Sequence, residues 1–308
     1  MVGQISAPMT TATQHFGRWA TAIAWLVLPF VAGPSFGDAL DPRSRSVQLV
    51  ATIGLWAFWA IGLIAALVPS TVSLTAIRIL APASVAAAAW AALVVADGAS
   101  TAESVALGMT TLATVIALSA PVGDRMVNGS SYGDERRMPL RPPGVLLLGP
   151  IELTWIVVVV GVVAGPMLLA AHQWIGGGVA LAVGWILAVL GLRVLHSLSQ
   201  RWFVFVPAGV VVVDRMALAD SLLAQRQRVD SIGPAPADTQ AVDLTVGAIG
   251  LALELRLTEP DLIIPAPPRR FGGGQATIEP VEVESVLFAP SRPGWVLEEA
   301  KRRRLLVD

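Results

Sequence analysis

The stretch that decides the fold is NGSSYGDERRMPLRPPG, residues Asn128–Gly144, which lies between two long apolar stretches. It holds the only tyrosine of the chain, three arginines, two acids and three prolines, and Asp124 and Arg125 come just before it. Only 14% of the whole sequence is charged. Because charged side chains are costly inside a bilayer, this interval is predicted to be a loop outside the lipid that separates two groups of membrane helices.

The overall composition agrees with a membrane protein. The chain has 308 residues, of which 55% are hydrophobic, and its mean hydropathy is +0.69. Soluble globular domains are roughly 45–50% apolar, glycine included. Charge is scarce before Asp124 and common after Arg193, so the net charge of −1 averages two different regions and supports no argument about the whole protein.

Six segments contain the approximately 20 mainly apolar residues that a helix needs to cross the hydrocarbon core. The predicted spans are Trp19–Gly37, Val47–Val68, Ile77–Ala96, Ser104–Val122, Ile151–Ala171 and Trp174–Leu195. The fourth is the least apolar because threonines and serines dilute it.

Arginine positions orient the predicted helices, because short cytoplasmic loops are enriched in Arg and Lys. With the Asn128–Gly144 loop placed inside, only Arg43 and Arg45 fall on the outer side. The arginines at cytoplasmic ends are Arg18, Arg78, Arg125, Arg136, Arg137, Arg141, Arg193 and Arg201. We therefore expect a multi-pass protein of the inner cell membrane with both termini in the cytoplasm. A cleaved signal peptide at residues 1–33 is a weaker alternative, because that segment has Arg18 as its single positive charge.

After Arg201 the pattern changes from long apolar runs to short strands. Strands are expected at Trp202–Val206, Val210–Asp214, Ser221–Arg226, Val229–Ile232, Leu251–Leu257 and Asp261–Pro265, with a weaker candidate at Asp243–Val246. Pro267–Gln275 is expected to be a flexible loop. Trp295–Leu306 is predicted to be a helix with acids early and bases late, as the helix dipole favours.

The predicted organisation follows from these segments. A flexible N-terminus at 1–17 precedes four membrane helices within 18–122, a cytoplasmic Arg- and Pro-rich loop at 123–150, two membrane helices within 151–196 and a cytoplasmic β-domain at 201–308. The predicted fold class is thus a membrane α-helical bundle of about six helices plus a small α+β domain with one C-terminal helix.

RWFVFVPAGVVVVDRMALADSLLAQRQRVDSIGPAP, which opens the tail at Arg201, resembles the start of bacterial pleckstrin-homology-like (PH-like) domains. The resemblance covers roughly Arg201–Asp308 and implies paired β-sheets closed by a C-terminal helix. The blocks SSYGDERRMPLRPPG and VLFAPSRPGWVLEEAKRR make the whole chain resemble multipass membrane proteins of actinobacteria, which implies no particular chemistry.

Small residues in the last two spans are candidates for helix packing, because they let helix backbones approach closely in lipid. These glycines are Gly161, Gly165, Gly176, Gly177, Gly178 and Gly184. They mark either a homodimer face or, as we favour, contact between the two helices of one short-looped hairpin.

Basic residues outside the spans are candidates for contact with anionic lipid headgroups, at about 1 kcal/mol for each charge near the membrane surface. They are Arg136, Arg137 and Arg141 in the loop and Lys301, Arg302, Arg303 and Arg304 near the end. The same residues can be explained without lipid binding. The C-terminal cluster can be a solvated helix end, and the loop arginines are already accounted for by the membrane topology. Glu152 and Arg78 lie at predicted cytoplasmic ends, where interfacial anchoring is the expected role.

Motifs for catalysis are scarce. The chain has no cysteine, and its three histidines have no partner at helical metal spacing. It also contains no HExxH or Walker-type loop, and we expect no cofactor, no metal and no catalytic residue.

The leading hypothesis is a non-enzymatic scaffold or accessory subunit whose β-domain contacts protein or anionic lipid. The expected partners are the bilayer and a protein or a second copy of the chain, with no nucleic acid. The alternative is a transporter of small molecules or lipids, with the threonine-rich fourth helix lining its path, and a membrane enzyme acting through Glu152, Asp134 or Glu135 is the third possibility.

Overall fold

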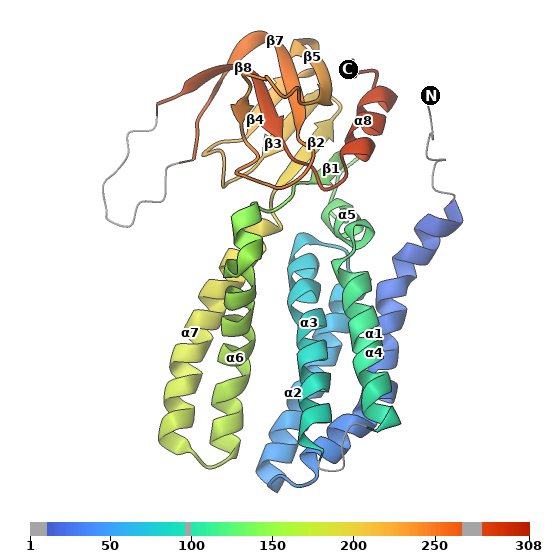
Figure 1. The fold of residues 1–308 in the computed structure, drawn as a ribbon, viewed down its shortest axis with the longest axis vertical. Coiled ribbons are helices and arrows are strands. Elements are labelled where there is room, and N and C mark those ends of the chain that lie inside the picture. The colour runs from blue at the N-terminus through green and yellow to red at the C-terminus, as the bar shows by residue number, and fades with distance from the viewer. Residues whose placement is uncertain (1–10, 96–99, 267–278) are drawn as a thin grey trace. The chain divides into compact units, whose positions relative to one another are not determined.

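The computed structural model describes residues 11–95, 100–266 and 279–308 (Figure 1). The predicted loop Pro267–Gln275 and the first ten residues lie outside this description. The chain forms two compact units, one of 1–126 with 159–185 and the other of 127–158 with 186–308. The predicted fold class is confirmed, because six long apolar helices accompany a domain of two small sheets and one terminal helix.

Six helices are long and apolar enough to span a membrane. They are α1 (Thr11–Leu40), α2 (Arg45–Leu67), α3 (Thr71–Val94), α4 (Thr101–Leu118), α6 (Pro150–Ala170) and α7 (Trp174–Leu198). The chain is therefore an integral membrane protein with several spans. In the first unit, α1 packs against α2, α3 and α4, and α3 packs against α2 and α4.

Helices α3 and α4 have boundaries that differ from the prediction in ways that matter for packing. Helix α3 begins earlier, at Thr71, because the Ser70 side chain caps it by accepting a hydrogen bond from the Ser73 amide. Arg78 consequently lies two turns inside the helix. Helix α4 ends at Leu118, and a separate short helix α5 (Ala120–Asn128) follows. The Arg78 guanidinium extends to α5, where a Cβ built on Gly123 would lie 3.2 Å from Nη2.

Two tryptophans connect α1 to α2 by reciprocal hydrogen bonds. Trp25 Nε1 donates to the Trp59 carbonyl at 2.8 Å, and Trp59 Nε1 donates to the Trp25 carbonyl at 3.1 Å. Lipid offers no alternative partner for an indole N–H, so each bond satisfies a group that would otherwise be costly. The Trp25 side chain is buried against Gly62, where an added Cβ would lie 2.2 Å from the indole ring.

The strands of the second unit form two four-stranded sheets. The first has the order β1-β2-β3-β4 and contains β1 (Arg136–Pro139), β2 (Trp202–Val206), β3 (Gly209–Val213) and β4 (Leu222–Gln225), all antiparallel. The second has the order β5-β7-β8-β6 and contains β5 (Val229–Pro234), β6 (Val242–Asp243), β7 (Leu253–Ile263) and β8 (Val281–Phe288).

The largest difference from the sequence prediction concerns the interval 123–150, which was expected to be a loop. Residues Arg136–Pro139 form β1, which pairs with β2 from Arg136 opposite Phe205 to Pro139 opposite Trp202. A 3₁₀ helix, η1 (Gly144–Leu148), follows it. The charged interval thus supplies an edge strand to the β-domain.

Smaller differences concern the later strands. Leu251–Leu257 and Asp261–Pro265 were predicted as separate strands, but they belong to one strand, β7, whose pairing with β8 shifts between Arg256 and Asp261. Strand β8 was not predicted. The C-terminal helix α8 (Pro293–Arg302) is shorter than expected.

One hydrophobic core lies between the two sheets. Phe203 of β2 stacks on Phe288 of β8 with ring centroids 4.3 Å apart, and both rings are fully buried. Helix α8 contributes Val296 and Ala300, one helical turn apart, to the same core. Figure 1 shows α8 alongside the sheets, and after it the chain pairs with β5 through the Ile232–Val307 bridge. We call this assembly, with β1 included, the β-domain.

The packing of Trp25 predicts the effect of a larger residue at position 62. Gly62→Val should displace the indole and break both tryptophan hydrogen bonds, at a cost of about 1–3 kcal/mol from overpacking. The measurement is the thermal unfolding midpoint of the detergent-purified protein. Gly54→Val is the matched control, because an added Cβ at Gly54 of the same helix meets nothing within 4 Å. Equal midpoints for the two variants would contradict this packing.

Candidate functional site

The β-domain joins α7 through a buried ion pair at its first residues. Arg201 lies between α7 and β2, and its Nε and Nη2 donate to the two carboxylate oxygens of Asp214 at 2.8 and 2.6 Å. Both side chains are almost fully buried, at 2% and 0% exposure. Arg201 Nη1 also donates to the Arg141 carbonyl at 2.9 Å, and the Arg201 carbonyl accepts from the Leu140 amide. Arg201 therefore joins α7, β3 and the 123–150 interval in one network.

Asn128 holds the other end of β1. Its side-chain amide donates to the Arg137 carbonyl, and its Oδ1 accepts from the Arg137 amide, both at 2.8 Å. An asparagine side chain that replaces a strand partner in this way satisfies two backbone groups at once. Because Asn128 is the last residue of α5, it fixes the point where the chain leaves that helix and enters the sheet.

Arg303, just after α8, brings three segments of the β-domain together. Its Nε pairs with Glu299 at 2.6 Å, its Nη2 donates to the Asp134 carbonyl, and its guanidinium lies 5.6 Å from the Phe205 ring centroid. Burial raises the pKa of Glu299, but hydrogen bonds from Arg302 and Arg303 outweigh it, so the pKa lies below its ordinary value. Glu299 is therefore a carboxylate that anchors these arginines.

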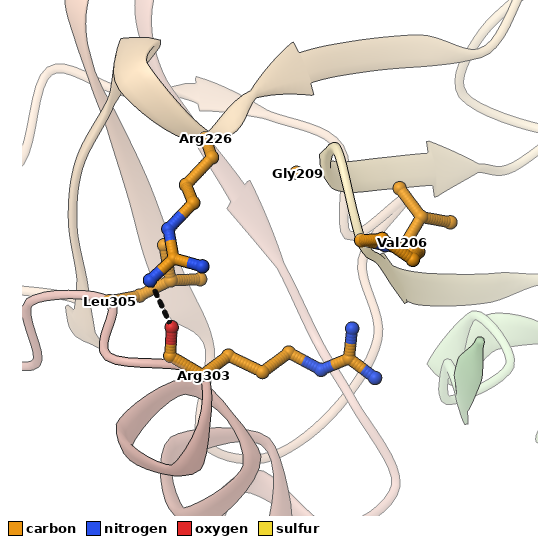
Figure 2. A pocket seen from close by; sticks show the side chains of 6 residues that line it. Val206, Gly209, Arg226, Arg303 and Leu305 are labelled. Atoms are coloured by element: carbon orange, nitrogen blue, oxygen red, sulfur yellow. Dashed lines mark hydrogen bonds between the residues drawn. The ribbon is translucent and has the colours of Figure 1, made fainter. Parts of the chain in front are cut away.

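A small pocket of about 80 Å³ lies beside Arg303. Its lining residues are Val206, Pro207, Gly209, Arg226, Arg303 and Leu305 (Figure 2). Arg226 Nη2 donates to the Arg303 carbonyl at 2.6 Å, which places a cation at the C-terminal end of α8, where the helix dipole favours it. Gly209 has φ +155, and an added Cβ would lie 2.1 Å from the Ala224 carbonyl oxygen, so only glycine fits there.

Of the three candidate lipid contacts in the 123–150 interval, Arg137 and Arg141 have the partners within the β-domain that are described next. Arg137 pairs with Glu135 at 2.7 Å and lies over the Trp202 ring at 5.4 Å. That hydrogen bond holds the pKa of Glu135 below its ordinary value. Arg141 donates from Nη1 to the Ile249 carbonyl at 2.9 Å. Arg136 is half-buried on β1, opposite Phe205.

The basic residues at the C-terminal end of α8 divide into two groups. Arg302 and Arg303 both pair with Glu299. Lys301 and Arg304 are exposed, and within the described residues their side chains have no carboxylate partner. Together with the exposed Arg226, they form a positively charged surface that we call the basic end of the β-domain.

The predicted packing glycines fall into two groups as well. An added Cβ on Gly165 would lie 2.5 Å from the Leu181 backbone, and one on Gly184 would lie 2.7 Å from the Gly161 carbonyl oxygen. Gly177 likewise lies against Leu169. These contacts recur every four residues along α6, at 161, 165 and 169, and place α6 directly against α7, whereas Gly176 and Gly178 face open space. Gly191, which was not singled out from the sequence, packs against Val158 and Thr154.

Two threonines of α4, Thr110 and Thr114, form hydrogen bonds with helix backbones. Thr114 Oγ1 donates to the Ala81 carbonyl of α3 at 2.8 Å, next to Pro82, and also to the Thr110 carbonyl. Thr110 is buried and donates to carbonyls of its own helix. Both hydroxyls are thus engaged in helix packing. Glu152 is exposed in the first turn of α6.

Within the described residues, no group of three or more His, Cys, Asp or Glu side chains is placed to hold a metal ion. In comparisons with known proteins, no family model, curated protein or solved structure matched the chain. The functional argument therefore depends on the geometry of the β-domain and its attachment to α6 and α7.

The structure brings together residues that sequence patterns did not connect. Arg201 was interpreted as a topological charge, and Asp214 was placed only at a strand end. Asn128 and Glu299 were not singled out either. The one local signal for the ion pair was an aspartate that directly follows four valines, because a carboxylate at the end of a buried strand requires a partner.

The buried ion pair makes a direct prediction. Asp214→Ala should leave the Arg201 guanidinium buried without a counter-charge and destabilise the β-domain by about 3–5 kcal/mol. The measurement is the rate of proteolysis within 201–308 for the full-length protein in detergent. Arg302→Ala is the control, because that arginine is 71% exposed and its pair contributes little. Similar proteolysis of both variants would contradict the role assigned to Asp214.

Proposed function

We propose that this integral membrane protein is a scaffold or accessory subunit of an assembly at the inner cell membrane. In this proposal its β-domain lies in the cytoplasm and contacts protein or anionic lipid. The observation that carries the proposal is the pairing of β1 with β2. Because β1 precedes α6 and β2 follows α7, two chain connections join the β-domain to the same helix hairpin.

A double attachment supports a docking role for a physical reason. A domain on one flexible linker samples many orientations, whereas two short connections restrict its rotation. Leu198 of α7 is followed within three residues by the buried Arg201, and a single residue, Gly149, separates η1 from α6. A partner bound to the β-domain is thereby held at a defined position above the bilayer.

The basic end provides the proposed contact surface. Arg226, Lys301 and Arg304 present positive charge that neighbouring carboxylates in the described residues do not neutralise. Such a surface attracts an acidic protein segment or anionic headgroups. The small size of the nearby pocket, about 80 Å³, favours surface contact over the enclosure of a metabolite.

The sheet arrangement supports the proposed PH-like character of the β-domain. An antiparallel meander β1-β2-β3-β4, a second sheet and a C-terminal helix packed into the shared core follow the order that the resemblance implies. The departure is that β1 is supplied from before the α6–α7 hairpin. A fragment starting at Arg201 would lack this edge strand and expose β2, so binding experiments require the full chain.

The transporter alternative has less support. Its proposed lining, the threonines of α4, uses Thr110 and Thr114 for hydrogen bonds to helix carbonyls. Within the described spans, ionisable side chains lie toward helix ends, as Glu103 does in the capping box of α4, except Arg78, which lies two turns inside α3. Flux through the reconstituted protein that is abolished by a substitution at Thr114 would restore this alternative.

Orientation can be tested by cysteine labelling, because the chain contains no cysteine. Tyr132→Cys and Leu306→Cys place single thiols at exposed sites of the β-domain, and Asp41→Cys places one after α1. An impermeant maleimide added to intact spheroplasts should label only position 41, and all three after lysis. Labelling of position 132 or 306 in intact spheroplasts would contradict a cytoplasmic β-domain.

The docking role itself is tested by photo-crosslinking in cells. A benzoylphenylalanine residue at position 301 or 304 should give adducts with a protein or phospholipid when the full-length protein is illuminated. Leu262, exposed on β7, is the matched position outside the basic end. Adducts equal in amount and identity at 262 and 301, or none at 301 and 304, would contradict specific docking at the basic end.

A further inference from the structure

Exposed apolar side chains gather where the β-domain meets the start of α6. Two segments far apart in the sequence contribute them: η1 and the loop between β6 and β7. The side chains and their exposures are Val145 73%, Leu147 47%, Leu148 82%, Ile249 69% and Leu251 51%. We call this group the apolar foot. Contiguous exposed apolar groups on a soluble surface usually mark a contact with another molecule or a membrane.

Hydrogen bonds and a β-bridge join the η1 segment to the loop between β6 and β7. Arg141 Nη1 donates to the Ile249 carbonyl at 2.9 Å, the Gly144 amide donates to the Gly247 carbonyl at 3.0 Å, and Pro143 forms a bridge with Ala248. A Cβ on Gly144 would lie 2.6 Å from Ile249 Cγ1, so the glycine lets the Ile249 side chain lie over η1. The foot is therefore one surface and not two independent loops.

The loop between β6 and β7 has a fixed conformation. Val246, Gly247 and Gly250 have φ values of 56, 71 and 115, and the Asp243 carboxylate accepts a hydrogen bond from the Thr245 amide at 2.7 Å. Thr245 is buried while Ile249 is exposed. Glycine adopts positive φ without steric cost, so Gly247 and Gly250 allow the turn that leaves Ile249 and Leu251 exposed at the surface.

The position of the apolar foot along the chain, next to a membrane span, indicates that the bilayer is the surface it contacts. Leu148 lies two residues before Pro150, the first residue of a membrane span. The packing of Gly191 against Thr154 sets the exposed Arg193 of α7 near the first turn of α6, a depth where an arginine reaches the headgroups. The headgroup region extends roughly 5–7 Å beyond the hydrocarbon on each side, and two residues of helical chain advance only about 3–4 Å.

From this continuity with the α6 span, we propose that the apolar foot inserts into the interfacial region of the bilayer that α6 and α7 cross. The β-domain would then rest on its own membrane through Ile249, Leu251 and Leu148, in addition to its two chain connections. Side chains at this level bury roughly 5–10 Å into the boundary between headgroups and acyl chains. This contact is independent of whatever molecule binds the basic end.

Single-cysteine labelling tests the insertion directly. Ile249→Cys, Leu251→Cys and Leu148→Cys each receive an environment-sensitive NBD fluorophore in the otherwise cysteine-free chain, reconstituted at one full-length protein per nanodisc. The nanodiscs carry phosphatidylcholine with a nitroxide at either a shallow or a deep acyl position. Leu262→Cys is the control, because Leu262 is 64% exposed at the far end of β7, roughly 25–30 Å along the strand from Leu253.

The expected result is blue-shifted emission at 249, 251 and 148, with quenching by the shallow nitroxide at least twofold stronger than at 262. The shallow nitroxide should also quench more than the deep one. Emission and quenching at 249 and 251 equal to those at 262 would overturn the proposal. Blue-shifted emission without nitroxide quenching would also overturn it, because protein and not lipid would then cover the foot.

Discussion

The pairing of β1 with β2 is the constraint on which the rest of the architecture depends. A strand that comes before α6 can pair with one that comes after α7 only if both strands lie on the same side of the membrane. The α6–α7 hairpin must therefore cross and return. The buried bond from Arg201 to the Arg141 carbonyl imposes the same requirement independently, because its two residues also flank the hairpin.

The second constraint is that every polar group in lipid needs a partner within the protein. Trp25 and Trp59 meet it by exchanging indole hydrogen bonds with each other's backbone, and Thr114 meets it at the Ala81 carbonyl beside Pro82. Glycines allow the necessary close approach at Gly62 in α2 and along α6 and α7. Small residues and shared polar groups thus contribute to packing in the membrane helices, together with large buried side chains such as Trp25 and Leu74.

The six spans and most strands could be predicted from the sequence because their signals are local. Twenty apolar residues define a membrane helix wherever they occur, and WFVFV followed by a Pro-Ala-Gly turn defines a hairpin. Strand β1 could not be predicted, because RRMP is charged and short and becomes a strand only through the edge that β2 offers. Strand β8 alternates glutamate and valine, but its partner β7 lies beyond a long intervening segment.

The candidate site was less accessible to prediction for a similar reason. Clusters of arginine identified the basic surface near α8, yet the division between arginines paired with Glu299 and those left unpaired depends on the fold. The burial of Arg201 against Asp214 could not be separated from its topological role, because an arginine after a span satisfies both. Ile249 could not be recognised as part of an exposed apolar surface from the sequence, because that surface forms only where its loop contacts η1 in the fold.

The split origin of the first sheet has a consequence for biosynthesis. When β1 leaves the ribosome, about 60 residues remain to be translated before β2 appears, an interval of roughly 3–12 s at 5–20 residues per second. During that time Met138 of β1 has no sheet to join. A chain whose last two helices insert wrongly leaves the two strands in different compartments, with the core of the β-domain open. Completion of this sheet therefore requires that α6 and α7 have integrated so that β1 and β2 lie on the same side of the membrane.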